Sequence, residues 1–357
     1  MTTYASGLSG QIGIVAAPSY GDSATAVTRF YEFLSETLTF NPGWLEGQGL
    51  KAGQAYDRGS RAVQSQFNGA GDIVMEHTDG SATSAAADSM GLCWKHALGS
   101  SVTTPTLIAS TAYKQIHTNG SKAGMYLTTQ VGRPQISGVT VQPHTFLGCK
   151  VVGWEFDCND NSIAQLKLTL DTQTESTSVG LAAASYPAPN SVFTFADATT
   201  FTLGGTASTS AGETTVSGGS AVLSRVNSVT ITGSTPMKTD RFGLGNAGLK
   251  GEPIENAKPT ITGQLGTEYF SRTEFYDVFK AGTPTVMQLD FSHGDAGGGN
   301  PYRLSFIFPQ VKFLSAGMNI SGPDVIPQTV GFKVYDDGSG TNPVIQVKLV
   351  SKESTAL

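Results

Sequence analysis

Hydrophobic and polar residues alternate over several short stretches of the chain, most regularly in residues 150–157, 165–171 and 346–349. In the first two stretches the apolar positions are Val152, Trp154, Phe156, Leu166, Leu168 and Leu170. A period of two residues places successive side chains on opposite faces of a strand. The pattern therefore predicts a mainly β protein whose antiparallel sheets have one face in a core and one polar face.

Two parts of the chain repeat the same succession of patterns. An alternating stretch is followed by a strand beginning with glycine, a helix-like segment and a further pair of strands. These elements lie at 36–40, 71–76, 84–98 and 150–171 in the first part, and at 226–232, 263–270, 271–281 and 310–335 in the second. The repetition predicts two tandem β-sandwich or open-barrel units, residues 1–180 and 181–357, each with one flanking α-helix.

Helical spacing of apolar residues occurs in residues 84–98 and 271–281. The apolar stripes consist of Met90, Cys93, Trp94 and Ala97 in the first segment, and of Phe275, Val278 and Phe279 in the second. Gly99 and Gly282 suit the left-handed residue that ends many helices. Ser271 and Glu274 form a capping-box pattern at the second start. We expect each stripe to cover a sheet.

Several segments lack both patterns. Residues 1–28 are predicted to form an N-terminal arm, 41–62 a long loop, 203–222 an exposed Gly/Ser/Thr-rich loop and 295–301 a flexible connector. Turn residues occupy 159–161 and 336–340. In the loop 41–62, Trp44, Leu45 and Leu50 are costly to expose to water. They pack either on their own domain or on a neighbouring molecule.

Charged residues make up only 14% of the chain, so we expect neighbours to cover much of its surface; an ordinary all-β domain with polar loops is the alternative. Residues 1–150 hold equal numbers of acidic and basic residues, so the net charge of −6 arises entirely after residue 150. An acidic surface repels phosphate. This argues against a conventional DNA-binding protein and fits a surface past which DNA moves without adhering, although solubility alone also explains it.

The three cysteines (Cys93, Cys149 and Cys158) are odd in number and form no Cys-x-x-Cys motif, which argues against a disulfide framework. No basic segment followed by an apolar run begins the chain, and no stretch approaches the length of apolar sequence that crosses a bilayer. The sequence therefore predicts a soluble protein made in the cytoplasm, with no membrane insertion.

No motif in the sequence predicts a reaction centre. Residues 243–248 match a dinucleotide fingerprint but lack the required strand before and helix after. Asp157, Asn159 and Asn161 match the start of a calcium loop, but Ser162 and Leu168 occupy its glycine and glutamate positions. The histidines have neither metal-ligand spacing nor a nucleophile elbow nearby; they are His77, His96, His117, His144 and His293. We predict no catalytic, cofactor-binding or metal-binding residue, and only a triad assembled from distant residues stays open.

The sequence of residues 237–265, 276–284 and 319–338 resembles that of the major tail tube proteins of long-tailed bacteriophages, of the non-contractile siphovirus type. The likeness covers most of the chain and is greatest over 226–350. It implies a structural virion protein with a β-sandwich or open barrel and one flanking helix. Six such folds close into a ring, and stacked rings form the conduit for the genome.

The resemblance also implies partners and a location. The tube contains the tape measure protein, ends at tail terminator and tail tip proteins, and lets double-stranded DNA pass without specific binding. It forms in the host cytoplasm and becomes the virion tail. If both halves of this chain are tube folds, three chains complete a ring, which we favour over six. The matching arms are residues 1–28 and 351–357, and the matching contact loops are 41–62 and 242–256.

Two sets of residues carry these expectations. The inter-subunit contacts are expected at Trp44, Leu45, Leu50, Phe242, Leu244 and Leu249. Acids on polar strand faces, expected either to line the lumen or to face solvent outside the tube, with the lumen as our assignment, are Glu155, Asp157, Asp171, Glu268 and Asp290. Two other functions remain open: a carbohydrate-binding or adhesive β-sandwich, in which Trp44 lies over a sugar groove, and a β-rich hydrolase.

Overall fold

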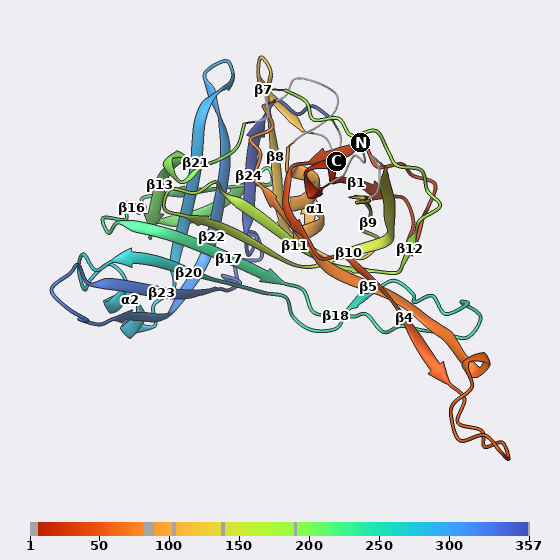
Figure 1. The fold of residues 1–357 in the computed structure, drawn as a ribbon. Coiled ribbons are helices and arrows are strands. Elements are labelled where there is room, and N and C mark those ends of the chain that lie inside the picture. The colour runs from red at the N-terminus through yellow and green to blue at the C-terminus, as the bar shows by residue number, and fades with distance from the viewer. Residues whose placement is uncertain (1–5, 82–88, 102–104, 137–139, 189–190, 356–357) are drawn as a thin grey trace.

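Eight neighbouring strands form the longest sheet in the computed structural model, which describes residues 6–81, 89–101, 105–136, 140–188 and 191–355 (Figure 1). Every pairing in this sheet is antiparallel. In spatial order the strands are β4 (Thr39–Glu46), β5 (Ala62–Glu76), β11 (Gln165–Thr172), β10 (Val141–Asn159), β17 (Val226–Ser234), β20 (Thr260–Glu268), β23 (Pro327–Val334) and β22 (Asn300–Met318). A short strand, β3 (Phe33–Glu36), continues β4 along the same edge of β5. The predicted mainly β class is confirmed.

Shorter sheets form the rest of the architecture, and they share β10 and β22 with the eight-stranded sheet. One has the order β2 (Arg29–Tyr31), β1 (Gln11–Ala17), β9 (Tyr126–Pro134), β10 and β12 (Thr174–Ser176). The other has the order β16 (Ser220–Ala221), β13 (Ala198–Leu203), β21 (Thr285–Gly297), β22, β24 (Gln346–Ser351) and β8 (Ala112–Asn119), with β6 (Gly99–Ser101) and β7 (Thr106–Ala109) beyond β8. β10 and β22 each have 19 residues, which lets each strand run from one layer into the next.

Aromatic side chains fill the space between the layers. Phe156 of β10 packs against Phe306 and Phe291, with ring centroids 4.7 and 5.5 Å apart. Trp94 and Trp154 add an edge-on contact of 5.3 Å. The buried apolar residues of both halves of the chain form one continuous core. Such burial is the main favourable term in folding, so the halves stabilise each other.

Two α-helices lie within the described residues: α1 (Gly91–Leu98) and α2 (Tyr276–Ala281). The left-handed residues that end them, Gly99 and Gly282, were predicted and are confirmed, with φ of 96° and 65°. Both helices are shorter than predicted, and residues 82–88 of the first prediction lie outside the described residues. The capping box is wrong, because Glu274 instead accepts hydrogen bonds from the main chain of Leu223 and Ser224.

The two halves of the chain repeat one arrangement of strands. The first half contributes β4, β5, β10 and β11, and the second contributes β17, β20, β22 and β23. In the sheet, each set stands in the order first, second, fourth, third. A helix follows the second strand of each set, and the third strand enters the other layer. The strands β1–β9–β10–β12 and β13–β21–β22–β24 also follow one order.

Irregularities in the pairing recur at matching positions. The strand β10 bulges at Val152 and β22 bulges at Leu314, each just after the strand begins to pair with its hairpin partner. The edge beside β5 bulges at Leu34, and the edge beside β20 bulges at Asn227. A bulge adds one unpaired residue and sharpens the local twist. The two halves therefore match residue by residue along these strands.

Strands from both sides of residue 180 pair with each other at two places. β10 pairs with β17 from Gly153↔Ser234 to Asn159↔Ser228. β8, which lies between α1 and β9, pairs with β24 near the C-terminus. The division of the chain into tandem units stays a prediction, and the shared sheets and core show that its halves are built as one body.

The predicted N-terminal arm is wrong over residues 11–17, and the predicted C-terminal tail is wrong at Ser351 and Glu353. β1 runs between β2 and β9, with Ile12 and Ile14 fully buried. At the other end, Ser351 completes β24, and Glu353 is 1% exposed in an ion pair of 2.5 Å with Arg29. Burial of Ile12 and Ile14 holds the N-terminal segment in the core, and the ion pair of Glu353 holds the C-terminal segment there. Residues 1–5 and 356–357 lie outside the described residues.

Two further predicted loops are regular hairpins. Residues 203–222 contain β14 (Thr206–Ser210) paired with β15 (Glu213–Ser217), and Glu213 joins this hairpin to Lys114 and Lys348. Residues 295–301 form the end of β21, a tight turn and the start of β22. The turn at 159–161 is confirmed, with Asn161 at a φ of 53°. Short 3-10 helices lie at Gly7–Ser9, Gly59–Arg61 and Phe195–Asp197.

The three cysteines are buried free thiols. Burial raises the pKa of Cys93 and Cys149 to about 12 and that of Cys158 to about 11, which keeps the thiols protonated and unreactive. Within the ranges that the structure describes, no helix has the length and apolar character needed to cross a membrane.

Candidate functional site

A long hairpin projects from the body at the outer end of the eight-stranded sheet (Figure 1). It consists of β4 and the first part of β5. The predicted loop 41–62 is therefore wrong over residues 41–46, which are strand, and at Ala62, where β5 begins. Three of the predicted contact residues lie on it, and Trp44, Leu45 and Leu50 are 60, 58 and 103% exposed. The hairpin therefore offers apolar side chains that its own domain does not cover.

The other predicted contact residues lie on the segment that joins β18 (Met237–Lys238) to β19 (Ile254–Glu255). Leu244 is fully exposed, whereas Phe242 and Leu249 are half-buried. Leu249 forms a bridge with Phe67 of β5, where the Phe67 N–H donates to the Gly248 carbonyl at 2.9 Å. The structure thus brings the two predicted contact segments together at the base of the hairpin.

Four alternating charges fasten this segment to the sheet. Lys150 of β10 and Asp171 of β11 are register partners. Lys250 approaches Asp171 with Nζ to Oδ1 at 2.7 Å, and Glu252 binds Lys150. The Glu252 carboxylate also accepts from the Gly124 N–H and the Tyr126 hydroxyl, both at 2.9 Å. Lys250 is 2% exposed, so this end of the polar face is sealed.

The pKa values of the two carboxylates reflect these surroundings. Burial raises the pKa of Asp171, and the hydrogen bond from Lys250 acts in the opposite direction. Burial also acts to raise the pKa of Glu252, but its hydrogen bonds with Lys150, Gly124 and Tyr126 outweigh burial and hold that pKa below its usual value. Paired, hydrogen-bonded charges of this kind fix the position of a segment because leaving one partner alone is costly.

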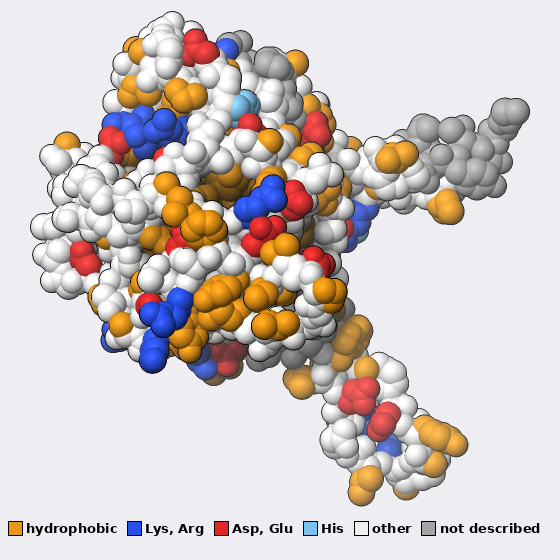
Figure 2. Space-filling view, turned by 90° about the vertical axis from the view of Figure 1, so that its left-hand side faces the viewer, with side chains coloured by type: hydrophobic (Ala, Val, Ile, Leu, Met, Phe, Trp, Pro, Cys, Tyr) orange, Lys and Arg blue, Asp and Glu red, His pale blue; other side chains and the backbone are white. Residues whose placement is uncertain are grey.

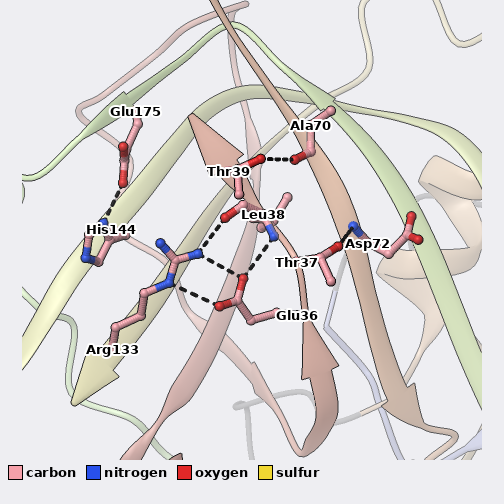
Figure 3. A network of polar contacts seen from close by, with 9 residues as sticks. All are labelled: Glu36, Thr37, Leu38, Thr39, Ala70, Asp72, Arg133, His144 and Glu175. Carbon is pink, nitrogen blue, oxygen red and sulfur yellow. Dashed lines mark hydrogen bonds and ion pairs between the residues drawn. The ribbon is translucent and has the colours of Figure 1, made fainter. Parts of the chain in front are cut away.

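A second polar cluster lies where β3 passes into β4 (Figure 3). Arg133 of β9 donates from Nε and Nη2 to the two carboxylate oxygens of Glu36, at 3.1 and 3.0 Å. Its Nη2 also donates to the Leu38 carbonyl at 2.6 Å, and the Leu38 N–H donates to Glu36 at 3.0 Å. Thr37, on the other side of the strand, pairs with Asp72 of β5. We call Arg133 and Glu36 the edge clamp.

The polar face of the eight-stranded sheet carries rows of small hydrogen-bonding side chains. Glu155 lies between its cross-strand partners Lys167 and Thr232, at 3.5 and 3.3 Å. Asp157 accepts from the Thr230 hydroxyl at 2.7 Å. Both acids are half-buried side by side on this face. The third acid, Glu268, lies on the same face near its end, 3.9 Å from Arg225.

The remaining two predicted lumen acids lie in closed surroundings. Asp171 shares the polar face but is covered by Lys250. Asp290 belongs to β21 in the other layer, where it is 6% exposed and binds Gln288 and Ser305. Lys250, Glu252 and Arg133 were not predicted, since each gains its partner only when segments distant in sequence meet.

The described residues contain no cluster of three or more metal-ligating side chains. His77 is fully buried; its Nδ1 donates to the Thr78 carbonyl and its Nε2 accepts from the Trp94 indole at 2.9 Å. Burial lowers its pKa to about 4, which keeps the ring neutral. The ring serves the core as a hydrogen-bonding partner, a role that needs no solvent-exposed chemistry.

The candidate functional surfaces are thus the projecting hairpin, the segment between β18 and β19 that the four charges hold to the sheet, and the polar face of the eight-stranded sheet. Over residues 7–334, the sequence matches the family model described as phage tail tube protein. The chain belongs to the phage tail tube protein family. No curated protein matches the chain at a significant level. As a phage tail tube protein it is a structural component of the virion tail, and its family is not a family of enzymes.

Proposed function

We propose that this phage tail tube protein assembles into stacked rings that form the tube of a siphovirus-type, non-contractile tail, the conduit through which the genome enters the host. The observation that carries this proposal is the eight-stranded sheet, whose outermost strands, β4 and β22, leave main-chain groups without a strand partner among the described residues. Edges of this kind invite pairing with other strands, and closure into a barrel removes them.

The repeated strand arrangement supports a ring of three chains. Each half of the chain contributes four strands and one helix in one order, which fits two tandem tube folds, residues 1–180 and 181–357. Three chains then supply six folds around the axis. A hexamer of this chain would require twelve equivalent sets of strands. A head-to-tail contact closes into a ring when its rotation matches the number of copies.

The polar face of the eight-stranded sheet is the proposed lumen surface. It offers threonines, glutamines and the acids Glu155, Asp157 and Glu268, and Glu155 is balanced by Lys167. Hydroxyl, amide and carboxylate groups do not neutralise phosphates, so contact with this face releases few of the counterions bound to DNA and the DNA passes without adhering. The same face contacts the tape measure protein while the tail is assembled in the host cytoplasm. Asp171 and Asp290 are left out because other side chains cover them.

Contacts between rings are proposed at the hairpin and the segment beside it. Trp44, Leu45, Leu50 and Leu244 are exposed there, and Phe242 and Leu249 of the segment beside the hairpin are half-buried. Apolar side chains that project into water are stabilised when a second surface removes them from it. The terminal rings then present the same surfaces to tail terminator and tail tip proteins.

The test is electron microscopy of the purified protein together with the mass of one ring by native mass spectrometry. Hollow tubes or stacked rings with three chains per ring are the expected result. Rings of six chains would refute the three-chain ring but retain the tube. A protein that stays monomeric at high concentration would overturn the proposed function.

A further inference from the structure

The joint between the two halves of the chain shows how one tube fold can be attached to the next. The third strand of the first half, β10, pairs with the first strand of the second half, β17. In that joint Glu155 lies opposite Thr232, and their side chains are hydrogen-bonded at 3.3 Å. In spatial order, the joint connects the last strand of the first four-strand set to the first strand of the second set.

The corresponding strand of the second half, β22, lacks such a neighbour. Its residues from Val311 to Met318 pair with β23 on one side, and β21 on the other side reaches only as far as Val311. No strand in the described ranges pairs with β22 beyond that residue on the β21 side. β10 has β9 and then β17 on the matching side. The place of β17 is therefore open beside β22.

The corresponding edge of the first half is open as well. β3 and β4 pair with β5 on one side, where Thr39 lies opposite Ala70 and Glu36 lies opposite Ile73. Within the part of the chain that the structure describes, no strand pairs with their outer side. β17, the matching strand of the second half, has β10 on that side. The two outer edges of the eight-stranded sheet are therefore complementary. The edge of β22 corresponds to the β10 side of the joint, and the edge of β3 and β4 corresponds to the β17 side.

Side chains at the two open edges are more exposed than the matching side chains in the β10–β17 joint. Val152 and Glu155 of β10 are half-buried, whereas the matching residues of β22, Leu314 and Gly317, are exposed, Leu314 by 54%. Thr232 of β17 is half-buried, whereas its counterpart Thr39 is exposed. On the face that carries β20, β23 and α2, hydrophobic side chains gather at the surface (Figure 2). The exposed apolar residues at this end of the sheet are Phe270, Leu314, Ile320 and Val325.

We propose that the free edge of β22 in one copy pairs with the outer edge of β3 and β4 in a second copy, in the register of the β10–β17 joint. This pairing rests on the proposed ring and names its contact. Because the bulges align the strands of the two halves, each residue pair of the β10–β17 joint has an equivalent pair in the proposed contact. Glu155↔Thr232 corresponds to Gly317↔Thr39, and Asn159↔Ser228 corresponds to Ser321↔Ser35. Every fold in the ring is then joined to the next by one kind of contact.

The edge clamp occupies one point of this edge (Figure 3). Because Thr37 and Thr39 direct their main-chain groups to β5, the N–H and C=O of Leu38 face outward. Glu36 accepts from that N–H and Arg133 donates to that C=O. Side chains thus supply the bonds that a neighbouring strand would supply. In the joined state Met318 of the second copy takes over these bonds, so the clamp protects the edge until a partner arrives.

Paired cysteines test the register directly. Two variants place cysteines at predicted partners, Gly317→Cys with Thr39→Cys and Ser321→Cys with Ser35→Cys. Two matched controls recombine the same four substitutions, Gly317→Cys with Ser35→Cys and Ser321→Cys with Thr39→Cys. All four positions are exposed, and the native cysteines are buried. Opposed residues in a non-hydrogen-bonded pair lie about 4.5 Å apart at Cα, within disulfide range, whereas a shift of four residues adds roughly 13 Å.

After mild oxidation of assembled protein, the in-register variants are expected to run on a denaturing gel as covalent oligomers, and the controls as monomers. A series of bands that stops at three chains supports the three-chain ring. Tubes that form without cross-linking, or with equal cross-linking in the controls, overturn this pairing and leave the proposed function intact. Failure of the unmodified chain to form rings overturns the proposed function, and the pairing with it.

Discussion

Arg133 donates one hydrogen bond to each carboxylate oxygen of Glu36, at 3.1 and 3.0 Å, and a third to the main-chain carbonyl of Leu38 (Figure 3). The fork is a geometry that a guanidinium provides and an ammonium does not. It ties β9 of the sheet β2–β1–β9–β10–β12 to the strand edge from which the hairpin leaves. The position of the hairpin base therefore depends on a contact between strands about a hundred residues apart along the chain.

Replacing this arginine is expected to loosen the strand edge. In Arg133→Lys the paired hydrogen bonds are lost, and stability falls by about 1 kcal/mol. Hydrogen exchange should become faster in a peptide covering residues 34–40. Arg272→Lys is the control, because Arg272 is 69% exposed in its ion pair with Asp277 and its loss should leave exchange unchanged. Unchanged exchange over 34–40 in the first variant would contradict a structural role for the clamp.

Lys250 is expected to be the most sensitive of the four charges in the fastened segment. Lys250→Met leaves Asp171 buried without its cation, and removal of one partner of such a pair costs about 3–5 kcal/mol of unfolding free energy. Adding Asp171→Leu should recover much of the loss, because no lone charge remains. Denaturant unfolding measures both variants. A double variant no more stable than Lys250→Met would show that the pair acts by packing alone.

Trp44→Asp tests the contact surface on the hairpin. Trp44 is 60% exposed, so the substitution should change folding stability by no more than about 0.5 kcal/mol. We expect a folded protein that no longer forms tubes, as judged by circular dichroism and electron microscopy. Leu107→Asp, at a residue of β7 that is 53% exposed, is the matched control and should still assemble. Normal tubes from Trp44→Asp would refute the contact assignment.

Three buried histidines predict acid sensitivity. Burial lowers the pKa of His77 to about 4 and that of His96 and His117 to about 3, from 6.5 in an unfolded chain. Between these values the unfolded chain binds more protons than the folded one. Stability is therefore complete above pH 6.5 and falls as the pH drops toward 3, by about 1.4 kcal/mol per histidine for each unit of pH once its unfolded form is charged.

His117→Leu separates this effect from other acid effects. Both ring nitrogens of His117 are buried without a hydrogen-bond partner among the described residues. The variant should therefore be at least as stable at pH 7, and its midpoint temperature should fall less between pH 6.5 and 4. Thermal unfolding at several pH values measures this. An unchanged pH dependence would remove His117 from the explanation.

The alternation of apolar and polar residues was sufficient to predict the strands that have one face in the core and one polar face. β10 and β11 follow from Trp154, Phe156 and the leucines of β11, all of which lie in the core. The repeat was visible because Gly71 and Gly263 occupy matching positions, opposite Leu38 and Ile231 respectively. In both halves this glycine lets the neighbouring strand approach closely, so a side chain there would collide with it.

The hairpins could not be predicted in the same way. β4 and the outer part of β5 have two exposed faces, and β14 and β15 consist largely of Thr and Ser. Strands without a buried face carry no hydrophobic period, so their pairing is set by the turn and by the surface they meet. The segment 242–256 was predicted as a contact loop, but the charges that hold it to the sheet were not, because Lys250 finds its partner Asp171 only in the folded chain.

The β10–β17 joint has a consequence for how fast rings can appear. Its two strands belong to one molecule, so they meet at a high effective concentration that dilution cannot change. The open edges of β22 and β3 belong to different molecules and meet only in proportion to how many molecules are present. In the proposed three-chain ring, half of the joints would be completed by folding, and the other half would depend on the concentration of the protein.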